Sequence, residues 1–409
     1  MTSAVRPILS ICIPSYNRSS LLLSLLQEMD RPDFLPFDFE VVVCDNASPD
    51  PGYAAIAEFR PEHYGYAYFR RSTNIGGAAN IGGCYRLASA EFCLHLSDDD
   101  RLISSEVAAI VARMQDDPQI QATFAGFEDY ERIGGRLVNG RGFEEGSFTQ
   151  DNAPGIVDML NCGRLAIPEL AIYRSMALGS ALFASAFAYF PYRVIERLLP
   201  LGVVRFQPQI YYTGIAQHSG ETERHIRTSD DFGMAGWSSV GRGFALLCQA
   251  ALGKPLYDLA ETPEQRLFLT LTRNAFVDAN NHARFFEALE LMEYLICLGA
   301  GALFSDDERT HTREMGYLDA IRLEIEKLPG VTTAHLIGLG DAGGTLSQMF
   351  LGHRSSVAVV KSASVMEVDP SHAAFVTPSD AMREQLISLF ALRPGFVFSL
   401  EAVRRAFSL

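Results

Sequence analysis

The first hundred residues repeat one pattern, in which a short apolar run is followed by polar residues and then by an amphipathic stretch. Apolar runs cover residues 8–13, 39–44, 66–70 and 92–96. Runs this short and continuous predict buried strands, whereas the leucine-rich stretch after Ser19 and the stretch 78–88 have helical periodicity. Strands that alternate with helices predict a parallel sheet covered by helices. The fold class predicted for this part of the chain is therefore α/β, with a mostly parallel sheet.

Each predicted strand ends in a cluster of polar residues. The clusters read PSYNR at 14–18, DNASPD at 45–50, NIGGAAN at 74–80 and SDDD at 97–100. Because the carboxyl ends of parallel strands share one edge of a sheet, where ligands bind in open α/β folds, we expect the clusters to line one crevice. Taken singly, each also fits a structural role, as a glycine turn, an Asx turn or an acidic loop that caps the helix expected near Ser104.

The acidic cluster points to a cation. Three adjacent carboxylates repel one another unless a positive charge offsets them. Mg²⁺ and Mn²⁺ prefer oxygen ligands and bridge carboxylates to the phosphates of a substrate. The four clusters together therefore suit a nucleotide, with a metal at the pyrophosphate and a glycine turn that allows close approach of the backbone.

In this order, the runs ILSICIPSYNR, VVVCDNASPD, NIGGAANIGG and LHLSDDDRL resemble the inverting nucleotide-sugar-dependent glycosyltransferases of family 2, which have the GT-A fold. The SDDD form is similar to abequosyl- and rhamnosyltransferase-like enzymes of bacterial surface polysaccharide synthesis. The resemblance covers about residues 8–135. It implies a UDP-, GDP- or dTDP-sugar donor, a glycan or lipid-linked acceptor, and Mn²⁺ or Mg²⁺ as cofactor.

Matching the family motifs position by position implies which side chains form the site. The metal motif of the family reads Asp-x-Asp-Asp, and its first position falls here on Ser97, which is a departure. The implied metal ligands are Asp98, Asp99 and Asp100. The implied donor-binding residues are Pro14, Tyr16, Arg18, Asp45, Asn74, Gly76, Asn80, Asp98 and Asp99.

Inverting transfer also needs a general base that deprotonates the acceptor hydroxyl. The family often supplies it from a Glu-Asp pair, but the corresponding residues 205–209 contain no acid. We take Glu221 and Asp230 as the candidate bases. The missing pair keeps a second hypothesis open, a catalytically inactive protein that binds nucleotide sugars or serves as a scaffold. A nucleotidyltransferase is disfavoured, because PSYNR has neither the glycine-rich loop nor the lysine that those enzymes carry after the first strand.

The middle of the chain gives weaker signals. We predict a strand at Gln121–Phe127, a hairpin turn at 131–136, and a glycine-rich lid or acceptor loop at 140–155 that carries Phe143 and Phe148. The apolar stretch 176–192 is shorter than the about 20 residues that span a bilayer, and we interpret it as a buried strand followed by a helix. A peripheral contact with a membrane remains open, as does a homo-oligomer.

The C-terminal half predicts two further parts. Apolar residues recur at helical spacing from about 244 to 328, whereas the last eighty residues alternate between strands and helices. The turn GLGDAGG at 338–344 resembles a dinucleotide-binding fingerprint, but Lys361 and Ser362 follow the next strand where an acid is expected. We expect a structural or docking role for this Rossmann-like module. The predicted domains are 1–243, 244–330 and 331–409.

Composition indicates which partners and which cellular compartment are compatible with the predicted function. The net charge of −15 argues against nucleic acid as a partner, since lysine and arginine supply most of that affinity. The seven cysteines form no CxxC pair, and no leader sequence is evident at the N-terminus, which favours a reducing compartment. We therefore expect a cytoplasmic glycosyltransferase, with the inner face of the membrane as an alternative location.

Overall fold

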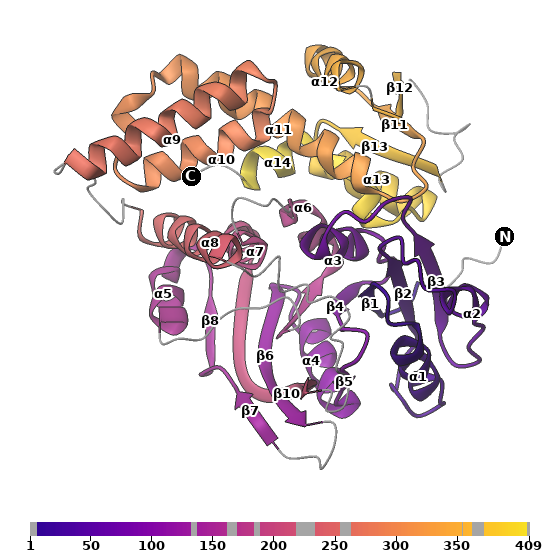
Figure 1. Cartoon of the computed structure of the whole chain (residues 1–409). Helices are drawn as coiled ribbons and strands as arrows, with labels where there is room; N and C mark the ends of the chain where they lie inside the picture. The colour runs from indigo at the N-terminus through magenta and orange to yellow at the C-terminus, as the bar shows by residue number, and fades with distance from the viewer. Residues whose placement is uncertain are drawn as a thin grey trace. The chain divides into compact units, whose positions relative to one another are not determined.

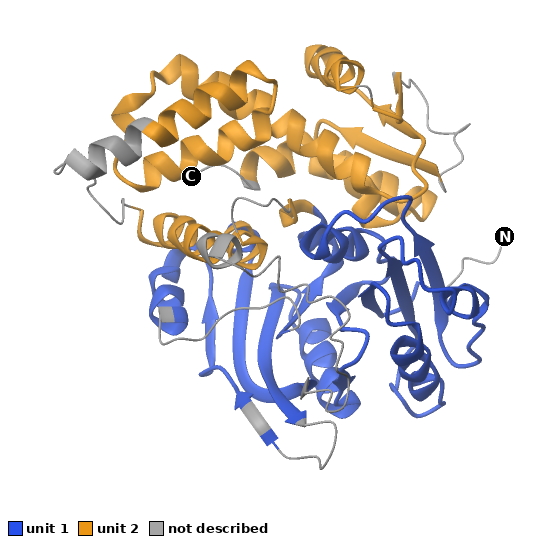
Figure 2. Cartoon of the chain, in the orientation of Figure 1, with its two compact units in different colours: residues 1–179, 198–233 blue, residues 180–197, 234–409 orange. Residues whose placement is uncertain are grey.

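The computed structural model describes residues 6–131, 137–161, 170–183, 189–217, 234–253, 263–353, 355–361 and 372–406. The chain forms two compact units, coloured separately in Figure 2. Unit 1 comprises residues 1–179 and 198–233, and unit 2 comprises residues 180–197 and 234–409. Unit 1 is therefore discontinuous in sequence. The predicted domain boundaries at 243 and 330 stay predictions.

Unit 1 is built on a sheet that begins with four parallel strands in the order β3-β2-β1-β4 (Figure 1). These strands match the four predicted apolar runs and are β1 (Leu9–Ser15), β2 (Phe39–Asp45), β3 (Gly65–Arg70) and β4 (Phe92–His95). The helices that connect and follow them are α1 (Ser19–Met29), α2 (Tyr53–Glu58), α3 (Gly77–Arg86) and α4 (Ser104–Asp116). The predicted alternation of strands and helices is confirmed.

Beyond β4 the sheet mixes strand directions. Its order continues β9-β6-β10-β5, in which β9 runs antiparallel to both β4 and β6, and β6 runs parallel to β10. Short strands β7 and β8 pair with β6 and β10. The bounds are β5 (Arg101–Leu102), β6 (Ile120–Glu131), β7 (Leu137–Arg141), β8 (Gly146–Phe148), β9 (Ala171–Arg174) and β10 (Val203–Gln217). The predicted α/β class with a mostly parallel sheet is confirmed.

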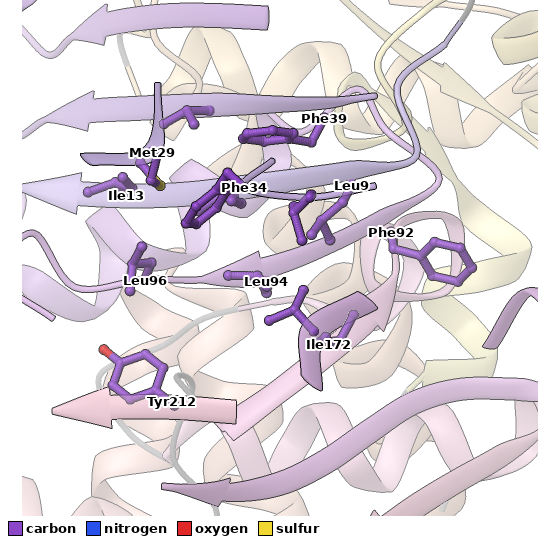
Figure 3. Packing of buried hydrophobic residues seen from close by; sticks show 14 of the residues in the cluster. Leu9, Ile13, Met29, Phe34, Phe39, Phe92, Leu94, Leu96, Ile172 and Tyr212 are labelled. Atoms are coloured by element: carbon purple, nitrogen blue, oxygen red, sulfur yellow. The ribbon is translucent and has the colours of Figure 1, made fainter. Parts of the chain in front are cut away.

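The core of unit 1 lies between this sheet and its helices. Leu9 and Ile13 of β1 and Phe39 of β2 pack with Met29 of α1 (Figure 3). The same cluster extends across the sheet through Leu94 and Leu96 to Ile172 of β9 and Tyr212 of β10. The apolar runs that predicted the strands therefore also fix the register of one strand on the next, because they are buried together.

Two predictions for the middle of the chain are wrong. Residues 140–155 are not one glycine-rich loop, because they form the end of β7, strand β8 and the start of α5 (Pro154–Asn161). Their role as a lid or acceptor segment stays a prediction. The rings of Phe143 and Phe148 are buried, with centroids 5.1 and 5.8 Å from that of Phe206. The strand expected from residue 176 is instead helix α6 (Ser175–Ala181), since β9 has already ended at Arg174. An alanine-rich run has the higher propensity for helix.

Unit 2 contains the predicted helical region. Its long helices are α8 (Met234–Leu252), α9 (Pro263–Asn281), α10 (Phe285–Cys297) and α11 (Asp306–Lys327), and the earlier segment contributes most of α7 (Phe190–Leu198). None of the helices in the described residues is long and apolar enough to cross a membrane. The helical prediction is confirmed for the described parts of the range 244–328.

The end of unit 2 is a small parallel sheet in the order β12-β11-β13-β14. Its elements are β11 (Thr333–Leu336), α12 (Gly340–Gly352), β12 (Ala358–Lys361), β13 (Ala373–Thr377), α13 (Asp380–Phe390), β14 (Val397–Ser399) and α14 (Leu400–Ala406). Gly338 and Gly340 have φ angles of 67° and 55°, a conformation that favours glycine. The predicted Rossmann-like module is confirmed as an arrangement of strands and helices.

Candidate functional site

The polar clusters of unit 1 lie at one edge of the sheet. In the register of the parallel strands, Ser15 is opposite Asp45, and Asp45 is opposite Arg70. Strand β4 runs parallel to β1 on the other side, with His95 opposite Cys12. The carboxyl ends of all four strands therefore face the same way, and side-chain contacts connect the clusters.

A chain of hydrogen bonds joins the turn after β1 to the acidic turn after β4. The Ser15 hydroxyl donates to Asp98 Oδ2 at 2.5 Å and is itself bonded to the Tyr53 hydroxyl. The backbone N–H of Arg18 donates to the same Tyr53 oxygen at 3.3 Å. Because Ser15 has one proton and gives it to Asp98, Tyr53 must donate to Ser15. Residues from β1, α2 and the acidic turn thus fix one another.

Arg18 pairs with two of the three aspartates. Its Nη1 atom lies 3.0 Å from Asp98 Oδ1 and 3.0 Å from Asp99 Oδ2. The Asp98 carboxylate is 5% exposed, whereas the Arg18 side chain is 37% exposed and can be reached from solvent. Burial raises the pKa of Asp98 to about 6, against the opposing effect of Arg18. This guanidinium supplies the positive charge that adjacent carboxylates require.

The third aspartate, Asp100, is held by a different strand. Its Oδ2 accepts a hydrogen bond of 2.6 Å from the Tyr212 hydroxyl, and its Oδ1 accepts one of 2.8 Å from the backbone N–H of Ile215. Both partners belong to β10. Asp100 is partly exposed, although both of its carboxylate oxygens accept hydrogen bonds from β10.

Three of the predicted donor residues are buried and bonded within the protein. Asp45 is fully buried and accepts hydrogen bonds from the Ser48 N–H and the Tyr68 hydroxyl, each at 2.8 Å. Asn80 is 2% exposed, accepts from Arg71 Nε at 2.7 Å and donates to a backbone carbonyl. With Asp98, these residues shape the turns around the site. The partly or fully exposed members of the predicted set are Pro14, Tyr16, Arg18, Asn74, Gly76, Asp99 and Asp100.

The glycine turn is tied to the end of β2 by Asn46. The Asn46 side chain donates to Asn74 Oδ1 at 2.8 Å and accepts from the Ile75 N–H at 3.0 Å. Gly76 has a φ of 83°, and a β-carbon on it would meet no atom within 4 Å. The space beside Gly76 is therefore open, as close approach of a ligand to the backbone there requires.

The acidic turn can supply only one or two carboxylate ligands to a cation. Among the described residues, no group of three or more Asp, Glu, His or Cys side chains converges on one point. Mg²⁺ is nevertheless commonly held by one or two carboxylates together with substrate phosphates and water. Asp99 and Asp100 are partly exposed, whereas Asp98 is turned into the protein toward Ser15. Asp99 and Asp100 are therefore the two carboxylates of the turn that could share a cation with a diphosphate.

Sequence reasoning missed four residues that organise this edge, namely Ser15, Asn46, Tyr53 and Tyr212. Ser15 and Asn46 lie inside clusters that the sequence had singled out. Tyr53 and Tyr212 carry no local signal, because their partners are distant in sequence. The candidate bases Glu221 and Asp230 lie outside the described residues.

His95, which precedes the acidic turn, gives a testable pH dependence. Burial lowers its pKa from 6.5 to about 3, so the folded protein holds it neutral. An unfolded chain would take up a proton below pH 6.5, and the stability contributed by neutral His95 is therefore lost as pH falls from 6.5 toward 3. In His95→Gln, the slope of the unfolding free energy against pH should fall by about 1.4 kcal/mol per pH unit between pH 4 and 6.

Urea titrations of wild type and His95→Gln at several pH values measure this slope. The difference between the two proteins cancels the other titrating groups, including Asp98. Identical slopes would contradict a neutral buried imidazole.

Comparison with known proteins identifies the same part of the chain as the polar turns described above. Residues 10–166 match the model of the family described as "Glycosyl transferase family 2". This part of the chain is therefore similar to a family 2 glycosyltransferase domain. The match begins in β1 and includes the polar turns after β1 to β4. The resemblance found in the four sequence clusters is confirmed.

Relatives of the family 2 domain are matched over part of their length. Abequosyltransferase RfbV of Salmonella typhimurium is 31% identical over 104 residues, which are 25% of this chain and 31% of that protein. Poly(ribitol-phosphate) β-N-acetylglucosaminyltransferase TarS of Staphylococcus aureus strain Mu50 is 27% identical over 183 residues, 44% of this chain and 29% of that protein. The chain thus spans about a third of the length of these curated relatives.

Solved structures are similar at lower identity. The crystal structure of S. aureus TarS 1-349 in complex with UDP-GlcNAc has a TM-score of 0.41 and 15% identity, and covers 85% of this chain and 87% of that one. A mannosyltransferase from Pyrobaculum calidifontis, in complex with GDP-Man and Mn²⁺, has a TM-score of 0.38 and 15% identity. It covers 72% of this chain and 87% of that chain.

Proposed function

We propose that this protein is an inverting glycosyltransferase that moves a sugar from a nucleoside-diphosphate sugar to a glycan or lipid-linked acceptor in surface polysaccharide synthesis. The observation that carries the proposal is the direct pairing of Arg18, after β1, with Asp98 and Asp99, after β4. It joins two of the four family motifs in one site. The family 2 match supports the same reaction class. The reaction would take place in the cytoplasm or at the inner face of the membrane.

Donor binding would use the exposed part of this site. Tyr16 and Arg18 would contact the nucleoside, and Asn74 with the turn at Gly76 would border the diphosphate. The buried side chains would hold these residues in place, because their polar atoms are bonded to neighbouring turns; they are Asp45, Asn80 and Asp98. A UDP-, GDP- or dTDP-sugar fits this arrangement equally well.

A divalent cation, Mn²⁺ or Mg²⁺, would be held by Asp99 and Asp100, with Asp98 behind them. When bound, such an ion neutralises charge on the diphosphate leaving group. Within the chain, a hydroxyl and a backbone N–H both donate to the Asp100 carboxylate and so fix its orientation. Arg18 keeps the neighbouring carboxylates from repelling one another as the anionic donor arrives.

The transfer step needs a base on the opposite side of the sugar. The acceptor hydroxyl would attack the anomeric carbon, its proton would pass to a carboxylate, and the nucleoside diphosphate would leave with the bonding electrons. Glu221 and Asp230 stay our candidates for that carboxylate. The alternative is a protein that binds the donor without transfer, which the lack of an acid at the start of β10 favours.

A panel of nucleotide sugars tests the proposal. We expect one of UDP-glucose, UDP-N-acetylglucosamine, GDP-mannose and dTDP-rhamnose to raise the melting temperature in the presence of Mn²⁺, and slow hydrolysis to release its nucleoside diphosphate. Stabilisation without release, even with glycan acceptors added, would favour the binding protein. No shift and no release with any donor, or with the free UDP, GDP and dTDP, would contradict the proposal.

A further inference from the structure

The hydroxyl of Tyr212 is bonded to both ends of the acidic turn. It donates to Asp100 Oδ2 at 2.6 Å, and it accepts a hydrogen bond of 3.2 Å from the backbone N–H of Ser97. One phenolic oxygen thus spans the turn 97–100 from its first residue to its last. Because an ionised carboxylate can only accept, the proton of this hydroxyl is committed to Asp100.

The ring that carries this hydroxyl is fixed in the core. Tyr212 is 3% exposed and belongs to the same apolar cluster as Leu94 of β4 and Leu96, which follows that strand and precedes the turn (Figure 3). A buried aromatic ring has few accessible rotamers, so its hydroxyl keeps one position relative to β4. The anchor for the turn is therefore the hydrophobic core of unit 1.

The backbone around Tyr212 is fixed as well. Strand β10 pairs with β5 directly after the acidic turn, with Tyr212 opposite Leu102 and Thr213 opposite Arg101. The N–H of Ile215 holds the second oxygen of Asp100 at 2.8 Å. Both carboxylate oxygens are therefore oriented by β10, one through a side chain and one through the backbone.

We propose that Tyr212 is a positioning residue for the donor site, which orients the Asp100 carboxylate toward the cation and the diphosphate. This inference rests on the proposed function. Partners that orient metal-binding carboxylates typically contribute 10- to 100-fold to metal affinity or activity. Without the hydroxyl, Asp100 keeps the Ile215 N–H but can rotate, and the turn loses its link to Ser97.

The test is Tyr212→Phe, with Tyr66→Phe as its matched control. Tyr66 is a partly buried tyrosine of β3 whose hydroxyl donates at 2.8 Å to the backbone carbonyl of Ile56, remote in sequence from the acidic turn. Tyr212→Phe loses the two hydrogen bonds of its hydroxyl, and Tyr66→Phe loses one, so the control also removes a partly buried tyrosine hydroxyl from unit 1. Nucleoside diphosphate release is measured against Mn²⁺ concentration at saturating donor, with the donor found in the panel. Calorimetry measures the affinity of each variant for Mn²⁺ in the presence of the matching nucleoside diphosphate, so the test does not depend on turnover.

We expect Tyr212→Phe to raise the half-saturating Mn²⁺ concentration by about 10- to 100-fold, with the rate at saturating Mn²⁺ within about threefold of wild type. Tyr66→Phe should leave that concentration unchanged. If Tyr212 had only a structural role, Tyr212→Phe would lower the fraction of active protein, and hence the rate. The half-saturating Mn²⁺ concentration would stay that of wild type, and this result would overturn the inference. An unchanged Mn²⁺ requirement in Tyr212→Phe does so too.

The proposed function fails in a different way. If wild type releases no nucleoside diphosphate and calorimetry finds no binding of UDP, GDP or dTDP with Mn²⁺, the proposed function is wrong and the positioning role is wrong with it. If wild type is active and Tyr212→Phe titrates with Mn²⁺ like wild type, only the positioning role is wrong.

Discussion

Replacing Asp100 by asparagine should reduce release of nucleoside diphosphate from the donor by about 10²- to 10³-fold, the usual effect of losing one preorganised electrostatic group in an active site. The substitution keeps the size of the side chain but removes its charge. The amide nitrogen cannot accept a hydrogen bond, so either Tyr212 or Ile215 would lose its acceptor. The measurement is the initial rate at saturating donor and Mn²⁺.

Asp116→Asn is the matched control for this prediction. Asp116 is an exposed aspartate at the end of α4, in the same unit. It should keep the wild-type rate. Both variants should melt within a few degrees of wild type, because each replaces a single partly or fully exposed carboxylate. An unchanged rate in Asp100→Asn would refute the assignment of Asp100 to the site.

The second large effect concerns stability. Arg193 of α7 is 1% exposed and pairs with Glu196 at 2.5 Å and with Glu293 of α10 at 2.8 Å. Arg193→Met keeps much of the side-chain volume but removes the guanidinium that is hydrogen-bonded to both buried glutamates. Removing one partner of a buried ion pair costs about 3–5 kcal/mol, and we expect a loss of that size in the free energy of unfolding of unit 2.

Urea unfolding at pH 7 measures this loss of free energy. Two further variants serve as a control and as a partial rescue. Arg284→Met breaks exposed pairs with Asp278 and Glu287 and should cost at most about 1 kcal/mol. Burial raises the pKa of Glu293 to about 7, so its charge is already costly with the arginine present. Adding Glu293→Gln to Arg193→Met should therefore recover part of the loss. Equal costs for Arg193→Met and Arg284→Met would contradict a stabilising buried pair.

The parallel part of the sheet could be predicted because its signals are local. A continuous apolar run such as Val41–Val43 is buried on both faces, and the polar residues that follow it mark the end of the strand. Parallel pairing then places Ser15 beside Asp45 without further information. The four clusters of the site followed from this regularity.

The remaining parts depend on contacts that are distant in sequence. Tyr212 and Asp100 are 112 residues apart in sequence, and no local pattern near either residue predicts their contact. Phe143 lies among glycines, which suggested a loop, yet its ring packs against Phe206, which lies on another strand. Asp45 looked like a ligand-binding acid, but its carboxylate is occupied by Ser48 and Tyr68. Polar residues at strand ends thus mark the site without separating ligand contacts from turn-forming contacts.

The discontinuity of unit 1 has a consequence for how the protein is made. A nascent chain leaves the ribosome with β1 to β4 and the acidic turn long before Val203–Gln217 is synthesised, and residues 180–197 of unit 2 emerge in between. Until β10 arrives, Asp100 has neither the Tyr212 hydroxyl nor the Ile215 N–H. A truncated protein that ends with the family match at residue 166 would therefore contain all four sequence clusters and still lack the strand that orients the last aspartate.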